Sequence, residues 1–425
     1  MSAGGTVHIA GAGLAGLSAA VRLAEAGRNV IVHEAAPAAG GRCRSYADPS
    51  LGLVIDNGNH LLLSGNHAAL DYLDRIGARA TLRDPGAAVF DFADLASGER
   101  WRLALSEGRI PWWLFRAAGR VPGTRLREYL APLGVLLKRG RGATVGEAMR
   151  CEGPLYERLW RPLLTSALNT DPPESSAALT AALLRETLGA GGAACRPLFA
   201  ADGLARSFID PALAFLKARG AEVRYGDRLR GLRFDGGRAA ELAFDSGAQP
   251  LAADDALVLA VPPWIAAELL PGLETPDVFR AILNVHYRTA PPPGQPAILG
   301  VVNGQTEWLF AFPDRLSVTI SNADRLIDRP REALAAAIWR EVAALTGLPD
   351  TPPPWQIVKE KRATFAATPA QDARRPPAQT QWRNVVLAGD WTRTGLPATI
   401  EGAVRSGYKA ASLIAGFGPA APGSP

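Results

Sequence analysis

Two copies of Gly-Asn-His, at residues 58–60 and 65–67, are the most concentrated group of potentially reactive residues in this sequence. Imidazole can bind a metal ion or transfer a proton near neutral pH. A metal site needs three or four ligands, whereas the other histidines and the three cysteines lie on widely separated segments. We therefore expect no metal site. The second copy fits the start of a helix capped by Ser64 or Asn66, whereas His60 of the first copy can be either a structural histidine or a residue that transfers a proton.

A glycine-rich turn near the start of the chain predicts a dinucleotide site. The turn follows a predicted strand, Val7–Ala10, and opens a predicted helix that Gly27 terminates. A second strand ends at Glu34, whose carboxylate can bind ribose hydroxyls. The first glycine permits the tight turn, the second lets the backbone approach a pyrophosphate, and the third lets the helix pack closely. The binding residues expected here are Gly11, Ala12, Gly13, Leu14, Ala15, Gly16, Glu34 and Ala35.

The second strand is followed by "AAPAAGGRCRSY", and the chain later contains "IDNGNH" and "NVVLAGDWTRTGLPATIEGAVRSGYKAA". With the glycine-rich turn, these segments resemble the flavin amine oxidase and phytoene desaturase superfamily. A solvated loop with a surface arginine is the alternative for the short Gly-Gly-Arg segment. The resemblance implies FAD as cofactor and adds these contact residues: Gly41, Arg42, Gly58, Asn59, His60, Leu229, Gly389, Asp390, Thr399, Ile400 and Ala403.

The C-terminal segment reads as a strand, Val385–Ala388, a turn and a helix over residues 400–411. By the resemblance, this helix points its N-terminus at the flavin ring, where its dipole stabilises negative charge on the reduced ring. A third piece, residues 203–234, reads as a helix ending at Gly220 and two short strands. Residues 255–264 read as one more strand.

We therefore expect an α/β fold of the amine-oxidase type, in which a Rossmann-like FAD-binding domain is interleaved with a mixed α+β substrate domain. A chain of 425 residues is long enough for two or three domains. The FAD-binding domain is expected at residues 1–84, 200–264 and 376–425. The substrate domain, facing the membrane, is expected at 85–199 and 265–375.

Residues 100–141 carry ten Arg or Lys against two Glu, with aromatic residues between them. Basic residues interleaved with aromatics are typical of segments that lie on a membrane surface. A solvated basic face above core aromatics is the alternative. We expect no nucleic-acid binding, because no known binding module accompanies the patch and the net charge is only +5. The sequence shows no secretory signal and no spanning segment, so we expect a cytoplasmic protein, peripheral on the inner face of the cell membrane.

A narrower resemblance involves four blocks: "DNGNHLLLSGNH", "RLWRPLLTSALNTDPPESSAALTAALL", "VKEKRATFAATPA" and "AGDWTRTGLPATIEGAV". Together they resemble the hydroxysqualene dehydroxylase family, although Asn59 stands where the family pattern suggests Gln. This resemblance implies reduction of hydroxysqualene to squalene by reduced FAD, in squalene and hopanoid biosynthesis. The candidate acids are His60 and Glu360, and Lys361 and Arg362 could form a charged relay or hold a flavin-bound water. The alternative for "KEKR" is a solvated charge run on a strand edge.

Other functions stay open from the sequence. A phytoene-type isoprenoid desaturase would share the fold and run the flavin in the oxidative direction. A flavin amine oxidase would act on amines and ignore lipid, and a non-catalytic flavin-binding protein would turn over no isoprenoid. A prenyl transferase would need clustered Asp residues for magnesium, and "DYLD" is too isolated to supply them. The sequence names no electron donor for the flavin.

Overall fold

The computed structural model describes residues 5–116, 119–138, 140 and 142–415. Its helices are α1 (Leu14–Glu25), α2 (His67–Arg75), α3 (Pro132–Leu137), α4 (Val145–Ala148), α5 (Arg161–Leu168), α6 (Ala177–Glu186), α7 (Asp210–Ala218), α8 (Pro263–Leu269), α9 (Arg331–Thr346), α10 (Pro369–Ala373) and α11 (Ile400–Ala415). In the described part of the chain, no helix is both long enough and apolar enough to cross a membrane.

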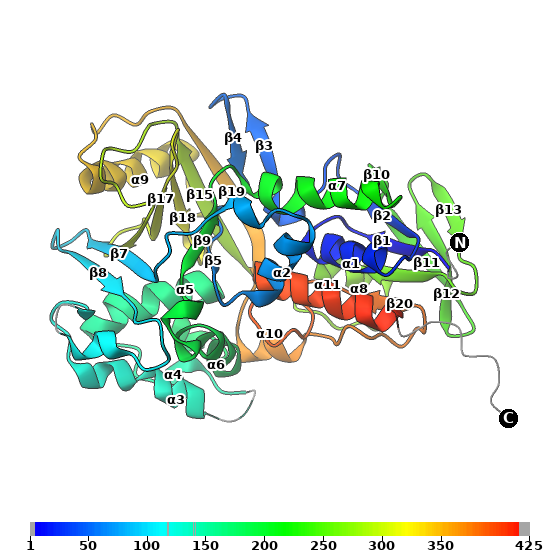
Figure 1. Ribbon diagram of the computed structural model, residues 1–425, viewed down its shortest axis with the longest axis horizontal. Helices are drawn as coiled ribbons and strands as arrows, with labels where there is room; N and C mark the ends of the chain where they lie inside the picture. Colours follow the sequence, from blue (N-terminus) through cyan, green and yellow to red (C-terminus); the bar gives the residue numbers. More distant parts are fainter. Residues whose placement is uncertain (1–4, 117–118, 139, 141, 416–425) are drawn as a thin grey trace.

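A parallel five-stranded sheet forms one end of the molecule (Figure 1). Its strands, in spatial order, are β10 (Glu222–Tyr225), β2 (Val30–Glu34), β1 (Val7–Ala10), β14 (Ala256–Leu259) and β20 (Val385–Leu387). Strands β1, β14 and β20 are buried along their whole length, as expected for a parallel sheet with both faces covered. The predicted strand Val7–Ala10 and the second strand ending at Glu34 are confirmed.

Helices α1 and α11 lie side by side against this sheet, although they stand at opposite ends of the sequence (Figure 1). Gly407 makes this contact possible, because a Cβ atom there would lie 2.1 Å from Ser18 Oγ and 2.3 Å from the Ala15 carbonyl oxygen. The predicted C-terminal helix is confirmed, and it continues to Ala415. A three-stranded antiparallel sheet adjoins this region, with strands β11 (Leu229–Asp235), β12 (Arg238–Phe244) and β13 (Gly247–Pro250).

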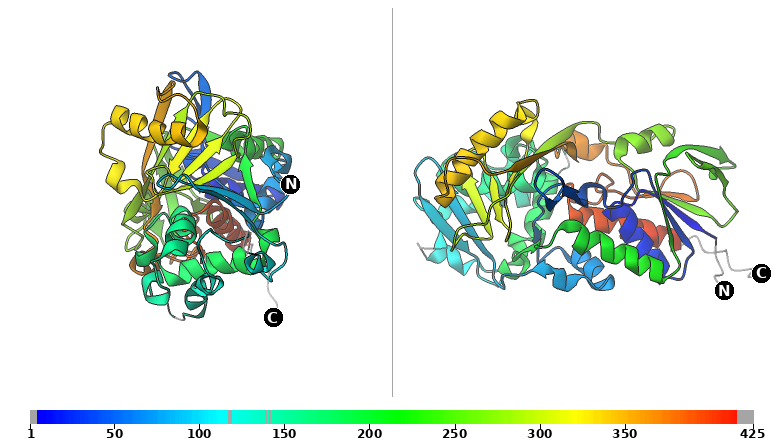
Figure 2. Two further views of the ribbon diagram at one scale, coloured as in Figure 1. Left: turned by 90° about the vertical axis from the view of Figure 1, so that its left-hand side faces the viewer. Right: turned by 90° about the horizontal axis from the view of Figure 1, so that it is seen from above.

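A seven-stranded mixed sheet forms the other end of the elongated molecule (Figure 2). Its strands, in spatial order, are β19 (Trp355–Phe365), β15 (Phe279–Tyr287), β18 (Leu316–Ile320), β17 (Trp308–Ala311), β16 (Ile298–Val302), β7 (Val89–Asp94) and β8 (Arg100–Ala104). Because side chains alternate along a strand, Leu309 and Ala311 pack in one core with α9, whereas Trp308 and Phe310 pack in another with α5 and α6. The sheet therefore separates two cores.

Short strands connect the two large sheets. Strands β3 (Ser45–Asp48) and β4 (Leu53–Asp56) form a hairpin. Strand β9 (Pro197–Ala200) pairs with both β5 (Leu62–Leu63) and β6 (Leu82–Arg83).

The helix after the second Gly-Asn-His begins at His67, and Asn66, one of the two predicted capping residues, occupies the N-cap position of α2. The predicted capping hydrogen bond is wrong, because Ser64 donates to the carbonyl of Ala193 and the Asn66 side chain accepts from Leu63 N–H. The carboxylate of Glu401 accepts from the N–H groups of Ala68 and Ala69 instead, at 3.1 and 2.8 Å. Because the acid belongs to α11, more than 300 residues away, no local sequence pattern could predict it.

Candidate flavin site

The glycine-rich turn between β1 and α1 has a tightly packed side and an open side. A Cβ atom on Gly16 would lie 1.9 Å from the Gly11 carbonyl oxygen, and one on Gly11 would lie 2.4 Å from the carbonyl oxygen of Ala260. A Cβ atom on Gly13 would meet nothing within 4 Å. The turn therefore packs closely on the sheet and leaves its middle glycine facing free space, as a pyrophosphate-binding turn requires.

The N-terminus of α1 is suited to an anion. Gly13 occupies the N-cap position, no side chain caps the helix, and the first turn contains no acidic residue. The first N–H groups of an α-helix have no partner within the helix and carry partial positive charge. A phosphate group can satisfy them, so this end of α1 fits the cofactor that the sequence predicts.

Glu34 ends β2, and both of its carboxylate oxygens accept hydrogen bonds from backbone N–H groups. Oε2 accepts from the Ala12 N–H at 2.7 Å, and Oε1 accepts from the Ala36 N–H at 2.8 Å. A carboxylate has about four acceptor positions, so it can still accept from the hydroxyls of a ribose. Leu229, the residue expected against the adenine, begins strand β11 of the three-stranded sheet and is buried.

The Gly-Gly-Arg loop packs on the glycine-rich turn. Gly40 N–H donates to the Ala12 carbonyl at 2.8 Å, and a Cβ atom on Gly41 would lie 3.5 Å from Gly13 Cα. Arg42 Nη2 lies 2.7 Å from Asp390 Oδ1, which joins this loop to the turn after β20. Residues that the sequence places at opposite ends of the chain thus surround one site.

The turn after β20 leads to the N-terminus of α11. Gly389 is packed against the indole of Trp391, since a Cβ atom there would lie 2.3 Å from Trp391 Nε1. Thr399 Oγ1 accepts from the Gly402 N–H at 3.0 Å, the contact of an N-cap residue. Ile400 begins the helix, and Ala403, one turn later, is half-buried.

The loop after β4 carries His60 and is linked to Glu360. Asn57 Nδ2 donates to Glu360 Oε2 at 3.1 Å, so the two candidate acids belong to neighbouring segments. Burial, together with the nearby Arg42 guanidinium, lowers the pKa of His60 to about 4. Its imidazole is therefore neutral at neutral pH.

Lys361 is not part of this group. Its side chain is 69% exposed, with Nζ 4.0 Å from a carboxylate oxygen of Asp328. The pairing of β19 with β15 shifts between Glu360 and Thr364, and such a bulge re-aims the side chains within it. The catalytic role of Lys361 stays a prediction to which this position adds no support.

The inner face of the seven-stranded sheet combines polar and aromatic side chains, and sequence reasoning missed it. Thr319 pairs directly with Trp308, and Ser317 with Phe310. Directly paired residues project from the same face of an antiparallel sheet. The amide of Asn59 contacts both hydroxyls, at 2.8 Å for Ser317 and 2.9 Å for Thr319. The aromatic side chains belong to the core that also contains Trp160, Leu164 and Leu168, the residues at helical spacing in the second sequence block.

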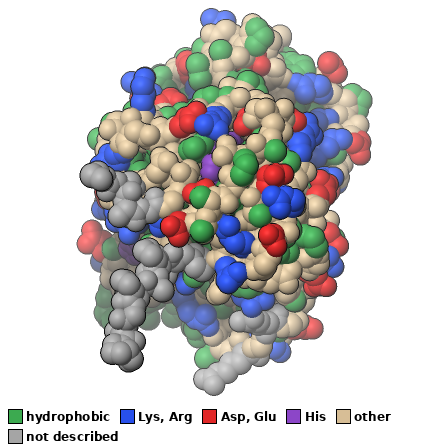
Figure 3. Space-filling view, turned by 90° about the vertical axis from the view of Figure 1, so that its right-hand side faces the viewer, with side chains coloured by type: hydrophobic (Ala, Val, Ile, Leu, Met, Phe, Trp, Pro, Cys, Tyr) green, Lys and Arg blue, Asp and Glu red, His purple; other side chains and the backbone are tan. Residues whose placement is uncertain are grey.

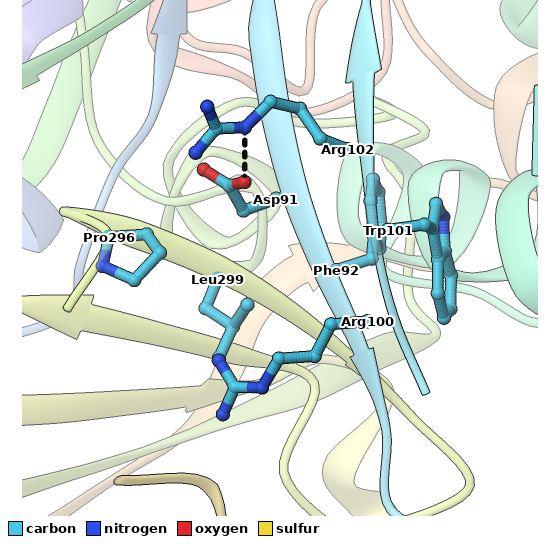
Figure 4. A pocket seen from close by; sticks show the side chains of 7 residues that line it. All are labelled: Asp91, Phe92, Arg100, Trp101, Arg102, Pro296 and Leu299. Carbon is cyan, nitrogen blue, oxygen red and sulfur yellow. Dashed lines mark hydrogen bonds and ion pairs between the residues drawn. The ribbon is translucent and has the colours of Figure 1, made fainter. Parts of the chain in front are cut away.

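A hollow at the edge of the seven-stranded sheet offers no free charged group in the part of the chain that the structure describes. The hollow, of about 260 Å³, is lined by Phe92 and Trp101, and its charged groups are already bonded (Figure 4). Arg102 pairs with Asp91 at 2.7 Å, and Arg100 donates to the Leu345 carbonyl. Among the described residues, no three His, Cys, Asp or Glu side chains are placed to share a metal ion.

Comparison with known proteins gives a consistent picture. The family model for flavin containing amine oxidoreductases matches residues 14–415. The chain is 59% identical over 414 residues to hydroxysqualene dehydroxylase of Rhodopseudomonas palustris, covering 97% of this chain and 99% of that protein. It is 54% identical over 407 residues to hydroxysqualene dehydroxylase of Sinorhizobium fredii, covering 96% and 97%. Among solved structures, cyclohexylamine oxidase from Brevibacterium oxydans has the same fold, with a TM-score of 0.67, 19% identity, and coverage of 97% and 99%.

Proposed function

Since the chain belongs to the flavin-containing amine oxidoreductases and, within them, to the hydroxysqualene dehydroxylase family, we propose that it reduces hydroxysqualene to squalene. It is an FAD-dependent oxidoreductase. The main support is the high sequence identity to two hydroxysqualene dehydroxylases over nearly their whole length. The glycine-rich turn, which packs closely on the sheet and leaves Gly13 open, also fits a flavin dinucleotide.

The residues that would hold FAD come from six segments. The glycine-rich turn and the N-terminus of α1 would bind the pyrophosphate, and Glu34 the adenosine ribose. Leu229 would cover the adenine. The flavin and its ribityl chain would lie between the Gly-Gly-Arg loop, residues 58–60 and the segment from Gly389 to Ala403.

We also propose that residues 1–84, 200–264 and 376–425 form the FAD-binding part and that residues 85–199 and 265–375 form the substrate part. In support, all strands of the five-stranded sheet lie in the first set and all strands of the seven-stranded sheet in the second.

The reaction requires a proton and a dry, apolar environment. Protonation of an allylic hydroxyl lets the C–O bond break with loss of water, and the carbon then accepts a hydride. Reduced FAD, when bound, supplies that hydride. The chain's own residues must deliver the proton to the hydroxyl oxygen and exclude water from the cation. The core of Trp160, Leu164, Trp308 and Phe310 would enclose the hydrocarbon chain.

His60 and Glu360 are the proposed proton donors, and they predict different pH dependence. With a pKa of about 4, His60 is protonated in only a small fraction of molecules at neutral pH. If His60 is the acid, the rate of flavin reoxidation by substrate should rise about tenfold per pH unit as the pH falls from 7 toward 5, and His60→Gln should abolish this rise. A rise that survives in His60→Gln and disappears in Glu360→Gln would assign the proton to Glu360.

We further propose that the enzyme binds the membrane surface through the segment around α3, which lies at the edge of the molecule (Figure 1). Trp112 is 62% exposed, Phe115 64% and Leu137 76%. Arg109 and Arg125 are also exposed. Apolar side chains beside cationic ones suit an interface that contains anionic lipid. Arg139 and Arg141 of the predicted patch lie outside the described residues.

A vesicle flotation assay tests the membrane proposal. The triple variant Trp112→Ser, Phe115→Ser, Leu137→Ser should lose most binding to vesicles containing phosphatidylglycerol. Val54→Ser is a matched control, because Val54 is an exposed apolar residue on β4. Equal binding of the triple variant and the wild type would contradict the proposal, and the solvated basic face would then be the better interpretation.

An anaerobic single-turnover experiment tests the main proposal. The purified flavoprotein is reduced with dithionite, hydroxysqualene is added in detergent, and flavin absorbance and squalene are measured together. One squalene formed per flavin reoxidised is the expected result. A flavin that stays reduced would refute the proposal and favour an oxidative desaturase or an amine oxidase, which the oxidised protein would reveal with phytoene or an amine.

A further inference from the structure

We infer that a buried chain of hydrogen bonds on the seven-stranded sheet positions the loop of residues 56–60, and with it His60. The positioning residues are His286, Ser317, Thr319 and Asn284. The part of the inference that concerns the reaction rests on the proposed function, whereas the part that concerns the loop does not.

The proton positions begin with His286, whose side chain is completely buried. Its Nε2 lies 3.1 Å from the Asp56 carbonyl oxygen, which can only accept, so Nε2 carries the proton. Burial, with the nearby Arg315, lowers the pKa of His286 to about 3, which leaves Nδ1 unprotonated. Nδ1 therefore accepts from Ser317 Oγ at 2.8 Å, and the Ser317 hydrogen points away from the loop.

The remaining links follow from this orientation. Ser317 Oγ is then free to accept from Asn59 Nδ2 at 2.8 Å, and the second hydrogen of that amide goes to Thr319 Oγ1 at 2.9 Å. Thr319 donates to Asn284 Oδ1 at 2.8 Å. Asn284 accepts from the backbone N–H of Asn59 at 3.3 Å and donates to the Asn57 carbonyl at 3.4 Å. This series of hydrogen bonds thus begins and ends on the same loop.

The four positioning residues are buried in the sheet, so each polar group depends on its partner. A buried donor or acceptor left unpaired costs the free energy of its lost hydration. Gly58 is also packed tightly against Asn284, because a Cβ atom on Gly58 would lie 3.0 Å from Asn284 Nδ2. A displacement of the loop would break several of these bonds together. The loop that presents His60 is therefore fixed to the substrate side of the molecule as well as to its own hairpin.

Two substitutions at Thr319 separate hydrogen bonding from packing. Thr319→Val keeps the shape and removes the hydroxyl, whereas Thr319→Ser keeps the hydroxyl and removes the methyl group. Thr180→Val is the control, because its buried hydroxyl donates to the Ser176 carbonyl within helix α6. In flavin-free protein, amide hydrogen exchange of the peptide covering residues 56–63 should become about five- to tenfold faster in Thr319→Val. Exchange should be within about twofold of wild type in the Ser variant and the control.

The same variants test the effect on the reaction. Single-turnover reoxidation of the reduced flavin by hydroxysqualene should slow about tenfold or more in Thr319→Val, because a small displacement of a catalytic group is costly. The substrate concentration for half-maximal rate should change little. Ser317→Ala interrupts the hydrogen bonds on the other side of Asn59 and should give the same result as Thr319→Val in both measurements. It takes the place of Thr319→Val if that variant does not fold.

Equal behaviour of Thr319→Val and Thr319→Ser would overturn the inference, because packing would then explain the position. Unchanged exchange in both Thr319→Val and Ser317→Ala would overturn it as well. If the wild type fails to reduce hydroxysqualene, the proposed function fails, and the exchange measurement still decides whether these residues hold the loop.

Discussion

Replacing Glu34 by Gln should weaken FAD binding more strongly than the removal of a charge from an exposed site would. Both carboxylate oxygens of Glu34 accept backbone N–H groups, from Ala12 at 2.7 Å and Ala36 at 2.8 Å. A glutamine has one oxygen, so its NH₂ group must face one of these N–H donors. The acceptor positions of Glu34 that remain free would bind ribose hydroxyls of FAD, and a hydrogen bond to a charged group contributes about 1.5–3 kcal/mol. Losing about 2 kcal/mol from the bound state corresponds to an affinity about 30-fold lower.

The affinity is measured by titrating flavin-free protein with FAD and following flavin fluorescence. Glu25→Gln is the matched control, because Glu25 ends α1 and pairs only with Arg22 and Arg75 at the surface. Thermal unfolding of the flavin-free proteins separates misfolding from lost binding. A Glu34→Gln protein that unfolds like the wild type and binds FAD with unchanged affinity would refute the role assigned to this carboxylate.

Three further changes have definite expected results. Gly16→Ala places a Cβ atom 1.9 Å from the Gly11 carbonyl oxygen, so the protein should purify without the visible absorbance of flavin. Burial raises the pKa of Glu307 from 4.5 to about 7, so its ionisation costs the folded state stability as the pH rises from 4.5 to 7. Urea unfolding should show Glu307→Gln more stable than wild type by up to about 3 kcal/mol above pH 7 and equal to it near pH 4.5. Glu401→Ala should cost about 1–3 kcal/mol of stability in the same assay at pH 7, because it leaves N–H groups at the α2 N-terminus without their buried carboxylate, whereas Arg405 keeps its ion pair with Glu186.

The flavin-binding half of the fold could be predicted because its signals are local. The strand Val7–Ala10, the turn and Glu34 follow each other within thirty residues, with spacing that the backbone geometry imposes. The helix after Asp390 has a regular pattern of small and apolar residues. The substrate half offers weaker signals, because its central strands are short, mostly buried and separated by loops of different length.

The positioning residues of the site could not be predicted from the sequence, because the residues that they contact are far away along the chain. Ser317 and Thr319 contact Asn59 across about 260 positions of sequence, and each is a single hydroxyl in an otherwise apolar strand. The exposed position of Lys361 could not be predicted either, since strand alternation alone does not anticipate the irregular pairing after Glu360. The alternative interpretation of "KEKR" as a charged strand edge fits the exposed side chain of Lys361 on the edge strand β19.

The order of strands in the five-stranded sheet has a consequence for synthesis in the cell. Strand β14 ends at Leu259, and its outer neighbour β20 begins at Val385. At about 5–20 residues per second, a ribosome needs on the order of ten seconds to make the intervening chain. During that time a buried, entirely apolar strand has an open edge, which is a site for aggregation. The proposed FAD site is incomplete until α11 emerges, so FAD can stabilise the protein only after residues 400–415 have been made. Expression yield should therefore depend on chaperone capacity more than on the supply of flavin during synthesis.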